Sequence, residues 1–311
     1  MLAIVCPGQG SQTPGFLEPW LELPGISETL NQWSEATGVD LATHGTTSDE
    51  ETIKDTAVAQ PLIVAGGLLA AQALEVEKLD TTSWMTAGHS VGEITAAGLA
   101  GVLPPIEALE FVRVRAQGMA AAAAIEPTGM AAVLGGDQDE VISYLEEHGI
   151  TPANVNGGSQ VVAAGSKKAL AALAENPMEK TRVIELKVAG AFHTQYMEPA
   201  VAELEAFAQG LITQDPVVAV ASNKDGTLVT SGQEFLHRLI SQVTSPVRWD
   251  LCQQTMIDEG VTGVIELLPG GTLTGIARRA MKSVKTLAIK TPGDLEKAQQ
   301  FIAEHTQTIS A

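Results

Sequence analysis

The chain of 311 residues has only two cysteines, Cys6 and Cys252, and little positive charge. Two cysteines cannot form a disulfide framework, and no Cys-x-x-Cys pair is present, so we expect neither a stapled scaffold nor structural zinc. Lys and Arg number 18 against 37 Asp and Glu, which gives a formal net charge of −19. A chain this acidic, with no basic stripe, is not expected to bind nucleic acid or an anionic membrane surface.

Long hydrophobic runs are also missing. The longest apolar stretch, residues 61–74, is shorter than the roughly 20 residues that a membrane-spanning helix needs. The N-terminal apolar run is short and has no basic segment, so no signal peptide is predicted. Hydrophobic residues nevertheless make up 45% of the chain and charged residues only 18%, which excludes intrinsic disorder. We expect a soluble, reduced, cytoplasmic protein of about two domains.

Short apolar runs alternate with helical patterns along most of the chain, which is typical of an α/β protein with a mainly parallel sheet. The expected strands are 2–6, 83–87, 217–221, 263–268 and 286–289. The expected helices are 60–75, 91–102, 104–124, 194–209, 233–243, 249–258, 273–281 and 294–304.

The middle of the chain has a different pattern. Its expected elements follow the order β-α-β-β-α-β, with strands at 129–134, 153–156, 161–164 and 182–188 and helices at 137–148 and 167–175. Two of these strands flank a Gly-Gly turn, as in a hairpin, and the order is that of a ferredoxin-like unit. We predict a subdomain over 126–189, inserted into a catalytic core made of 1–125 and 190–311, with a small-molecule site in the cleft between them.

The strongest local signal is Gly88-His89-Ser90-Val91-Gly92, a G-x-S-x-G sequence between an expected strand and an expected helix. This is the context of a nucleophile elbow, in which glycines permit a sharp turn and the helix N-terminus stabilises a developing oxyanion. A chance glycine-rich turn is the alternative. The pattern favours a nucleophilic Ser90, with the side chain of His89 packed elsewhere.

A serine nucleophile needs a base, and His193 stands out among six histidines because it lies between the last strand of the insert and a helix. A capping or packing histidine is the alternative. No Asp or Glu between Ser90 and His193 follows an expected strand of the main sheet. The sequence therefore favours a Ser-His pair whose imidazole is oriented by another group, such as a backbone carbonyl.

Two arginines, Arg113 and Arg115, lie among apolar neighbours on the expected helix 104–124. A buried arginine needs an anion, which is either a bound carboxylate or an internal acid. The glycine-rich turns at 7–12 and 269–272 lack the spacing of phosphate-binding loops. No cluster of metal ligands is visible, so we expect neither a metal nor a cofactor.

Seven motifs, in order, resemble one enzyme family. They are PGQGSQ at 7–12, GHSVGE at 88–93, RAQGM at 115–119, NVNGGSQVVAAG at 154–165, GAFH at 190–193, SQVTSPVRW at 241–249 and ELLPGGTLTG at 266–275. Together they resemble the malonyl-CoA:acyl carrier protein transacylases of type II fatty acid synthesis and the acyltransferase domains of polyketide synthases. The resemblance implies an α/β-hydrolase-like core with a parallel sheet and an inserted ferredoxin-like subdomain. It also implies malonyl-CoA as the acyl donor and acyl carrier protein as the acceptor.

The resemblance assigns the reacting groups position by position. Ser90 would be the nucleophile and His193 its base, with the imidazole held by the backbone carbonyl of Gln242. Arg115, rather than Arg113, would grip the malonyl carboxylate.

Further positions match residues that surround the acyl group. The amides of Gln9 and Val91 would form the oxyanion hole, and Phe192 belongs to the malonyl-selecting form of its motif. Asn156 and Asn223 match polar positions lining the acyl cleft.

Other interpretations stay open at this point. The same elbow occurs in serine thioesterases and esterases, and a trans-acting acyltransferase of a polyketide synthase or a non-catalytic carrier-binding subunit would share much of the pattern. An acidic carrier protein would need a basic patch on this acidic enzyme, and two candidates are present: Arg278, Arg279, Lys282 and Lys285, or Lys167 and Lys168. Either patch is equally typical of an ordinary solvated helix face. We expect a monomer.

Overall fold

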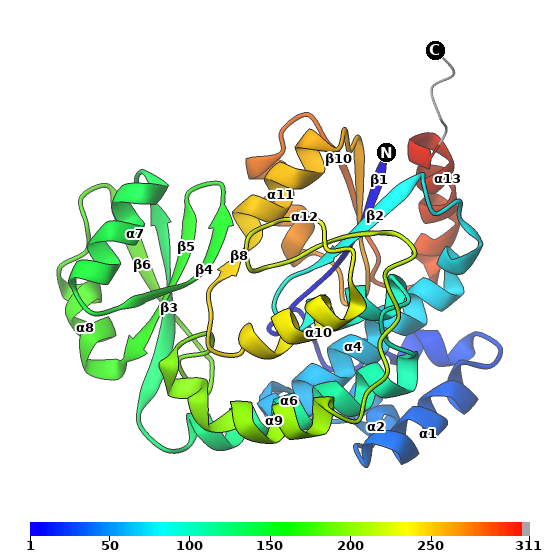
Figure 1. Ribbon diagram of the computed structural model, residues 1–311, viewed down its shortest axis with the longest axis horizontal. Helices are drawn as coiled ribbons and strands as arrows, with labels where there is room; N and C mark the ends of the chain where they lie inside the picture. The colour runs from blue at the N-terminus through cyan, green and yellow to red at the C-terminus, as the bar shows by residue number, and fades with distance from the viewer. Residues whose placement is uncertain (307–311) are drawn as a thin grey trace.

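The computed structural model describes residues 1–306, which form two sheets joined by helices (Figure 1). The first sheet is parallel, with five strands in the order β10-β9-β1-β2-β7. These strands are β1 (Leu2–Cys6), β2 (Trp84–Gly88), β7 (Ala219–Ala221), β9 (Gly263–Glu266) and β10 (Lys285–Ala288). Strands β1, β2 and β9 are buried throughout, which is why they read as continuous apolar runs.

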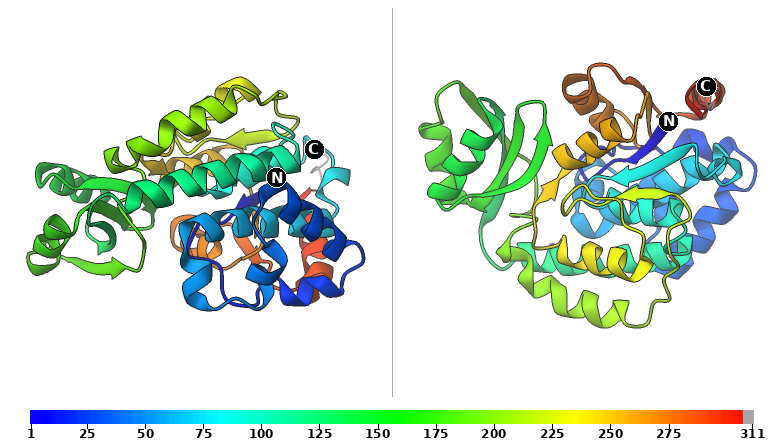
Figure 2. Two further views of the ribbon diagram at one scale, coloured as in Figure 1. Left: turned by 90° about the horizontal axis from the view of Figure 1, so that it is seen from below. Right: turned by 45° about the horizontal axis from the view of Figure 1, so that its top comes forward.

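Helices cover both faces of this sheet. They are α1 (Ile26–Thr37), α2 (Leu41–Thr46), α3 (Glu50–Lys54), α4 (Thr56–Ala73), α5 (Gly92–Leu99), α6 (Pro105–Ala123), α9 (Val201–Ala208), α10 (Gly232–Ser241), α11 (Trp249–Asp258), α12 (Thr272–Ala280) and α13 (Leu295–Thr306). Short 3-10 turns are η1 (Glu18–Glu22), η2 (Val76–Lys78), η3 (Gln195–Ala200) and η4 (Pro292–Asp294). Figure 2 shows the long helix α6 running from the parallel-sheet unit to the second unit.

Helix α4 is the one helix of residues 1–306 that is long and apolar enough to cross a membrane. However, 78% of it is buried inside the fold, as in the core helix of a folded domain, so its composition is weak evidence for a membrane span.

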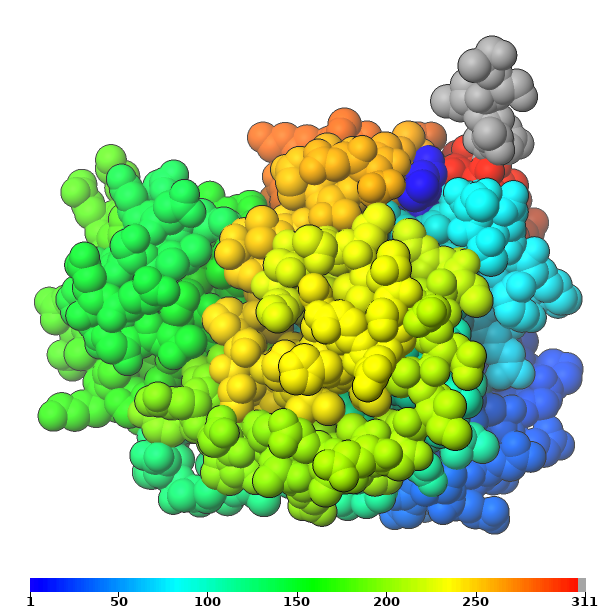
Figure 3. All heavy atoms as spheres, viewed as in Figure 1, coloured from blue at the N-terminus to red at the C-terminus, as the bar shows by residue number. Residues whose placement is uncertain are grey.

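The second sheet is built from the middle of the chain. Its elements are β3 (Thr128–Gly135), α7 (Gln138–Glu147), β4 (Thr151–Gly157), β5 (Gln160–Ser166), α8 (Lys167–Glu175) and β6 (Thr181–Leu186), in the predicted β-α-β-β-α-β order. These strands are antiparallel in the order β6-β3-β5-β4 and pack on α7 and α8 around a small apolar core of their own. In Figure 3 this segment, in green, forms a lobe beside the rest of the molecule.

A short strand, β8 (Val247–Arg248), comes from the core but pairs in parallel with β4 of the lobe. The sequence analysis did not predict it, because two residues after Pro246 carry no periodic signal. Its pairing ties the two units together a few residues after Gln242.

The α/β class with a parallel sheet is confirmed, and each predicted strand and helix exists within a few residues of its expected bounds. The prediction of one helix over 194–209 is wrong in detail, since Pro199 lies within the 3-10 turn η3 that precedes α9. Helices α1, α2 and α3 were not predicted. The sequence did contain a signal for two of them, because Asp40 and Asp49 cap α2 and α3 by accepting backbone N–H groups.

Candidate active site

The turn between β2 and α5 holds Ser90 in a conformation that few non-glycine residues adopt, with φ of 54°. Glycines on either side make this turn tight. A Cβ on Gly88 would lie 2.0 Å from the carbonyl carbon of Gly92, and a Cβ on Gly92 would lie 2.2 Å from the carbonyl oxygen of Cys6. No side chain fits at either place, so the sequence G-x-S-x-G is required for the turn to pack against β1.

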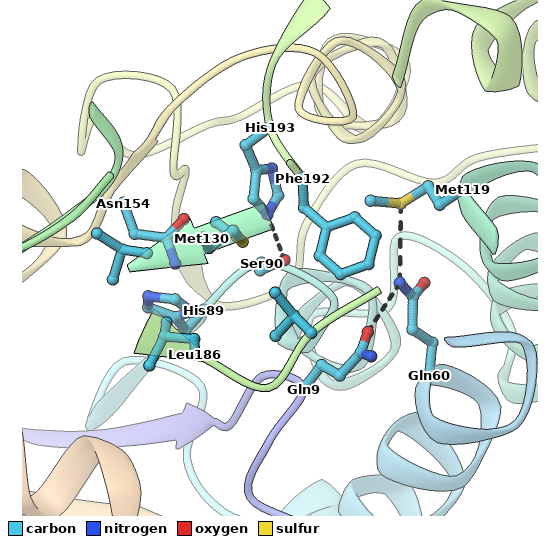
Figure 4. Close-up of a pocket in the computed structure, with 12 residues that line it drawn as sticks. Gln9, Gln60, His89, Ser90, Met119, Met130, Asn154, Leu186, Phe192 and His193 are labelled. Carbon is cyan, nitrogen blue, oxygen red and sulfur yellow. Dashed lines mark hydrogen bonds between the residues drawn. The ribbon is translucent and has the colours of Figure 1, made fainter. Parts of the chain in front are cut away.

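Ser90 and His193 are in hydrogen-bond contact, with Oγ 2.7 Å from Nε2 (Figure 4). The other ring nitrogen, Nδ1, lies 2.7 Å from the backbone oxygen of Gln242. Since a carbonyl oxygen only accepts, Nδ1 carries the hydrogen and Nε2 is left to accept the serine proton. Burial and then the nearby Arg115 charge lower the pKa of His193 to about 3, so the imidazole is a neutral base.

Arg115 on α6 is buried and its guanidinium lies between two amides. It donates from one terminal nitrogen to Gln60 Oε1 at 2.7 Å and from the other to Gln242 Oε1 at 2.8 Å. Burial lowers the pKa of Arg115 to about 10, and Glu93 opposes that shift. The group therefore stays charged at neutral pH. Its hydrogen-bond partners within residues 1–306 are both neutral, and the buried carboxyl of Glu93 lies beyond Gln242, so no acid touches the guanidinium.

Arg113 differs, since it donates to Gln117 Oε1 on its own helix at 3.1 Å. The two arginines thus differ in their surroundings: Arg115 bonds to Gln60, which lines the cavity described below, and to Gln242, whereas Arg113 bonds within its own helix.

Ser90 and His193 open on a cavity of about 90 Å³ between the two sheets (Figure 4). The other lining residues are Gln9, Gln60, His89, Met119, Met130, Asn154, Val162, Leu186, Val188 and Phe192. The walls are mainly apolar side chains of the lobe and of α6, whereas the polar groups converge at the elbow. Such a shape suits a short acyl chain with one polar end.

Gln9 and Phe192 line this cavity as predicted, and Val91 follows Ser90 directly and is fully buried. Within the described residues, the backbone amides of Gln9 and Val91 donate to no protein acceptor. Gln9 follows β1 and Val91 follows the nucleophile, and amides without a protein acceptor beside a nucleophile can serve as an oxyanion hole.

The structure corrects the expectation that Asn223 lines the cleft. Asn223 is fully buried behind the elbow, where its Oδ1 accepts the Ser90 N–H at 2.8 Å and its Nδ2 donates to the Gly88 carbonyl at 2.7 Å. It holds the turn from the far side, and its side chain has no donor or acceptor left for a ligand.

Asn156 is not on the cavity wall either, because its Oδ1 is 2.8 Å from His89 Nε2. The prediction that the His89 side chain packs elsewhere is wrong: it lines the cavity next to Ser90, oriented by Asn156. Burial lowers the pKa of His89, so this ring is neutral as well.

Three site residues were missed by the sequence analysis: Gln60, Asn154 and Glu93. Gln60 and Asn154 face the cavity, and the Oδ1 of Asn154 is buried without a protein partner. Glu93 is fully buried on an otherwise apolar helix. That acid, in the GHSVGE motif itself, was a signal that could have been recognised.

An outer groove continues from the cavity. It has a volume of about 730 Å³, shares Leu186 and Val188 with the inner cavity, and is lined by the cations Lys54, Lys167 and Lys187 among three acids. Of the two basic patches predicted, only Lys167 lies on this groove, while Lys285 of the other patch pairs with Glu304. Within residues 1–306 no group of three or more His, Cys, Asp or Glu is arranged to hold a metal.

Residues 3–308 match the acyl transferase domain family, and the chain belongs to that family. The malonyl CoA-acyl carrier protein transacylase of Mycobacterium tuberculosis strain H37Rv is 50% identical over 297 residues, covering 95% of this chain and 98% of that protein. The crystal structure of MCAT from Mycobacterium tuberculosis superposes with a TM-score of 0.92 at 49% identity, covering 96% of this chain and 99% of that one. A malonyl-transacylase solved in complex with its type II PKS acyl-carrier protein matches with a TM-score of 0.90 at 28% identity, covering 96% and 99%.

Proposed function

We propose that this enzyme transfers the malonyl group of malonyl-CoA to the phosphopantetheine thiol of acyl carrier protein, in fatty acid synthesis. The observation that carries the proposal is a Ser90–His193 pair and a buried Arg115 that contacts no counter-ion within residues 1–306. The pair supplies an acyl-accepting oxygen, and the arginine supplies the reason for choosing an acyl group with a free carboxylate. Both features agree with the names of the relatives described above.

In the first half-reaction, Ser90 Oγ attacks the thioester carbonyl and His193 Nε2 accepts its proton. The amides of Gln9 and Val91 donate to the oxyanion of the tetrahedral intermediate. Collapse breaks the carbon–sulfur bond, and His193 returns the proton to the departing thiolate of coenzyme A. The carbonyl of Gln242 holds the imidazole in the tautomer that both transfers require.

In the second half-reaction the thiol of acyl carrier protein attacks the malonyl-serine ester. His193 takes the thiol proton and then protonates Ser90 Oγ as the ester breaks, which completes a ping-pong cycle. Arg115 holds the malonyl carboxylate through both steps, and Phe192 packs beside the acyl chain.

The outer groove suits the long phosphopantetheine arm, because it leads from the surface to the cavity past Lys167 and Lys187. We assign docking of acyl carrier protein to this mouth rather than to the α12 patch. The two units described above would be an α/β-hydrolase-like core of 1–125 and 190–311 with a ferredoxin-like insert of 126–189. We also propose that the enzyme is a cytoplasmic monomer that uses no cofactor.

The test is intact-protein mass after brief incubation with malonyl-CoA, for the parent chain and for Ser90→Ala. We expect an adduct of malonyl mass on the parent, its absence from the variant, and its discharge when holo acyl carrier protein is added. Steady release of free malonate without transfer would instead identify a serine hydrolase. An adduct that only a polyketide carrier protein discharges would assign the enzyme to that pathway.

A further inference from the structure

Glu93 is a buried carboxylate that lies close to the reacting groups but touches none of them. It belongs to the first turn of α5, three residues after Ser90, and is fully buried. Its Oε1 accepts the backbone N–H of Asn223 at 2.7 Å, and its Oε2 accepts from Gln242 Nε2 at 2.5 Å. Both oxygens face donors, which is the arrangement that an ionised carboxylate needs.

The Gln242 side chain lies between two opposite charges. Its amide nitrogen donates to Glu93, while its amide oxygen accepts from Arg115 at 2.8 Å. Only one orientation of the amide satisfies both partners, since turning it over would place N–H against guanidinium N–H and oxygen against carboxylate. The same amide nitrogen also lies 3.1 Å from the Ser90 carbonyl oxygen and 3.2 Å from Asn223 Oδ1. Glu93 is the nearest of these three acceptors and the only acid among them, and together they determine which atom of Gln242 Arg115 meets.

The same residue also holds the base, because the backbone oxygen of Gln242 receives Nδ1 of His193. On the other side, Asn223 accepts the backbone N–H of Ser90 through its side chain. Glu93 thus reaches Ser90 through Asn223, and it reaches both His193 and Arg115 through Gln242. Burial raises the pKa of Glu93 to about 7, and the donors and Arg115 oppose that rise.

We propose that Glu93 is a positioning residue that fixes the Gln242 amide, and so aligns Arg115 with the Ser90–His193 pair. In this role it sets how strongly the site prefers an acyl group with a free carboxylate. The inference rests on the proposed function for its substrate. Its physical basis is that a glutamine at position 93 removes the nearest and, within residues 1–306, only acidic acceptor of Gln242 Nε2 and must turn a donor toward either Gln242 or the Asn223 N–H. The Ser90 carbonyl and Asn223 Oδ1 remain as acceptors, so the amide is held less firmly and Arg115 is less well aligned.

The experiment compares acylation of Ser90 by malonyl-CoA and by acetyl-CoA, followed by intact-protein mass, in the parent and in Glu93→Gln. Arg115 matters only for the donor with a free carboxylate. We therefore expect the malonyl rate to fall about 100-fold and the acetyl rate only about tenfold, a loss of preference of about tenfold.

The matched control is Glu266→Gln, which removes the charge of another fully buried carboxylate that does not line the cavity. It should lower the thermal stability and leave the malonyl-to-acetyl ratio unchanged. Glu93→Asp retains the charge at a shorter reach, so its ratio should lie between those of the parent and Glu93→Gln.

Equal losses on the two donors in Glu93→Gln, or in Glu93→Asp where the first variant does not fold, would overturn the inference. A selectivity change of the same size in Glu266→Gln would also overturn it. Absence of any malonyl adduct on the parent would instead contradict the proposed function, so the two failures are distinguishable.

Discussion

Two strand-to-helix turns of the parallel sheet have similar ingredients and different uses. The turn from β2 to α5 and the turn from β9 to α12 lie at the carboxyl ends of strands that flank β1, and each contains glycines and a fully buried glutamate. In the second turn, Glu266 accepts the backbone N–H groups of Leu273 and Thr274, both at 2.8 Å. The protein itself thus occupies the N-terminus of α12.

At the first turn the glutamate has other partners. Glu93 bonds to Asn223 and Gln242 rather than to the start of its own helix, and the amide of Val91 has no acceptor within residues 1–306. An open helix N-terminus can stabilise a developing negative charge, whereas one already filled by a carboxylate cannot. The comparison shows what distinguishes the reactive turn from the structural one. The amides at the start of α12 are satisfied by Glu266, whereas in the described part of the chain the Val91 amide at the start of α5 is left free for a ligand.

The largest expected effect breaks the reactive turn itself. In Gly92→Ala the new Cβ would meet the carbonyl oxygen of Cys6 at 2.2 Å, so the elbow must shift. We expect malonyl adduct formation to fall more than about 1000-fold, because misplacing the nucleophile by about 1 Å costs about 100-fold and misplacing the Val91 amide costs about 100- to 1000-fold more. Thermal unfolding and adduct mass measure the two consequences.

The control for that variant is Gly275→Ala in α12, where nothing lies within 4 Å of the added Cβ. It should raise stability by about 0.5–1 kcal/mol, as expected for replacing a helical glycine, and leave the acylation rate unaltered. Parent-like acylation in Gly92→Ala would contradict the account of the elbow.

The next effect concerns Arg115, the buried cation near the reactive turn. Arg115→Ala removes the charge that would pair with the malonyl carboxylate, and we expect malonyl acylation to fall about 100- to 1000-fold. Acetyl acylation should fall much less, since acetyl offers no anion. Arg113→Ala, which removes an arginine bonded to its own helix, is the matched control. Equal losses for the two donors in Arg115→Ala would argue against carboxylate recognition.

The smallest expected effect is the dependence of the acylation rate on protonation of His193. The pKa of His193 lies well below its ordinary value of 6.5, so the base stays neutral. In Glu93→Gln, which removes the carboxyl whose pKa burial raises to about 7, acylation by acetyl-CoA should therefore hold constant from about pH 5 to 7.5. If the acylation rate instead fell with a midpoint near pH 6.5, the ordinary pKa of histidine, the His193 ring would not be buried as described.

The same shift has a consequence for stability. Between the folded and the ordinary pKa, the unfolded chain binds a proton at His193 that the folded chain does not. The contribution of this group to the free energy of unfolding is therefore full above pH 6.5 and is lost as the pH falls toward about 3. Chemical denaturation at several pH values would measure it.

Much of the site was predictable because its signals are local. The elbow needs a strand, two glycines and a helix within a few residues, and all of them are visible in the sequence. The lack of a suitable acid between Ser90 and His193 also indicated a carbonyl partner, in agreement with the contact between His193 and Gln242.

Side-chain direction was not predictable in the same way. Asn156 and Asn223 were expected on the cleft wall because they match family positions, but a match in sequence does not say which way an amide points. Their partners, His89 and the Ser90 amide, come from a different part of the chain. Strand β8 was missed for a related reason, since only pairing with β4 makes its two residues a strand.

The sequence by itself determined the alternation of strands and helices, the insert and the sharp turn at Ser90, because each depends on neighbours along the chain. Only the tertiary structure decided that Ser90 meets His193, which lies 103 positions away, and that Gln242 meets Arg115 across 127 positions. Those contacts form between the two sheets, where Arg115 of α6 reaches Gln60 and Gln242. Burial there removes water from Arg115, His193 and Ser90, and it leaves each of them with the hydrogen-bond partners that the fold supplies.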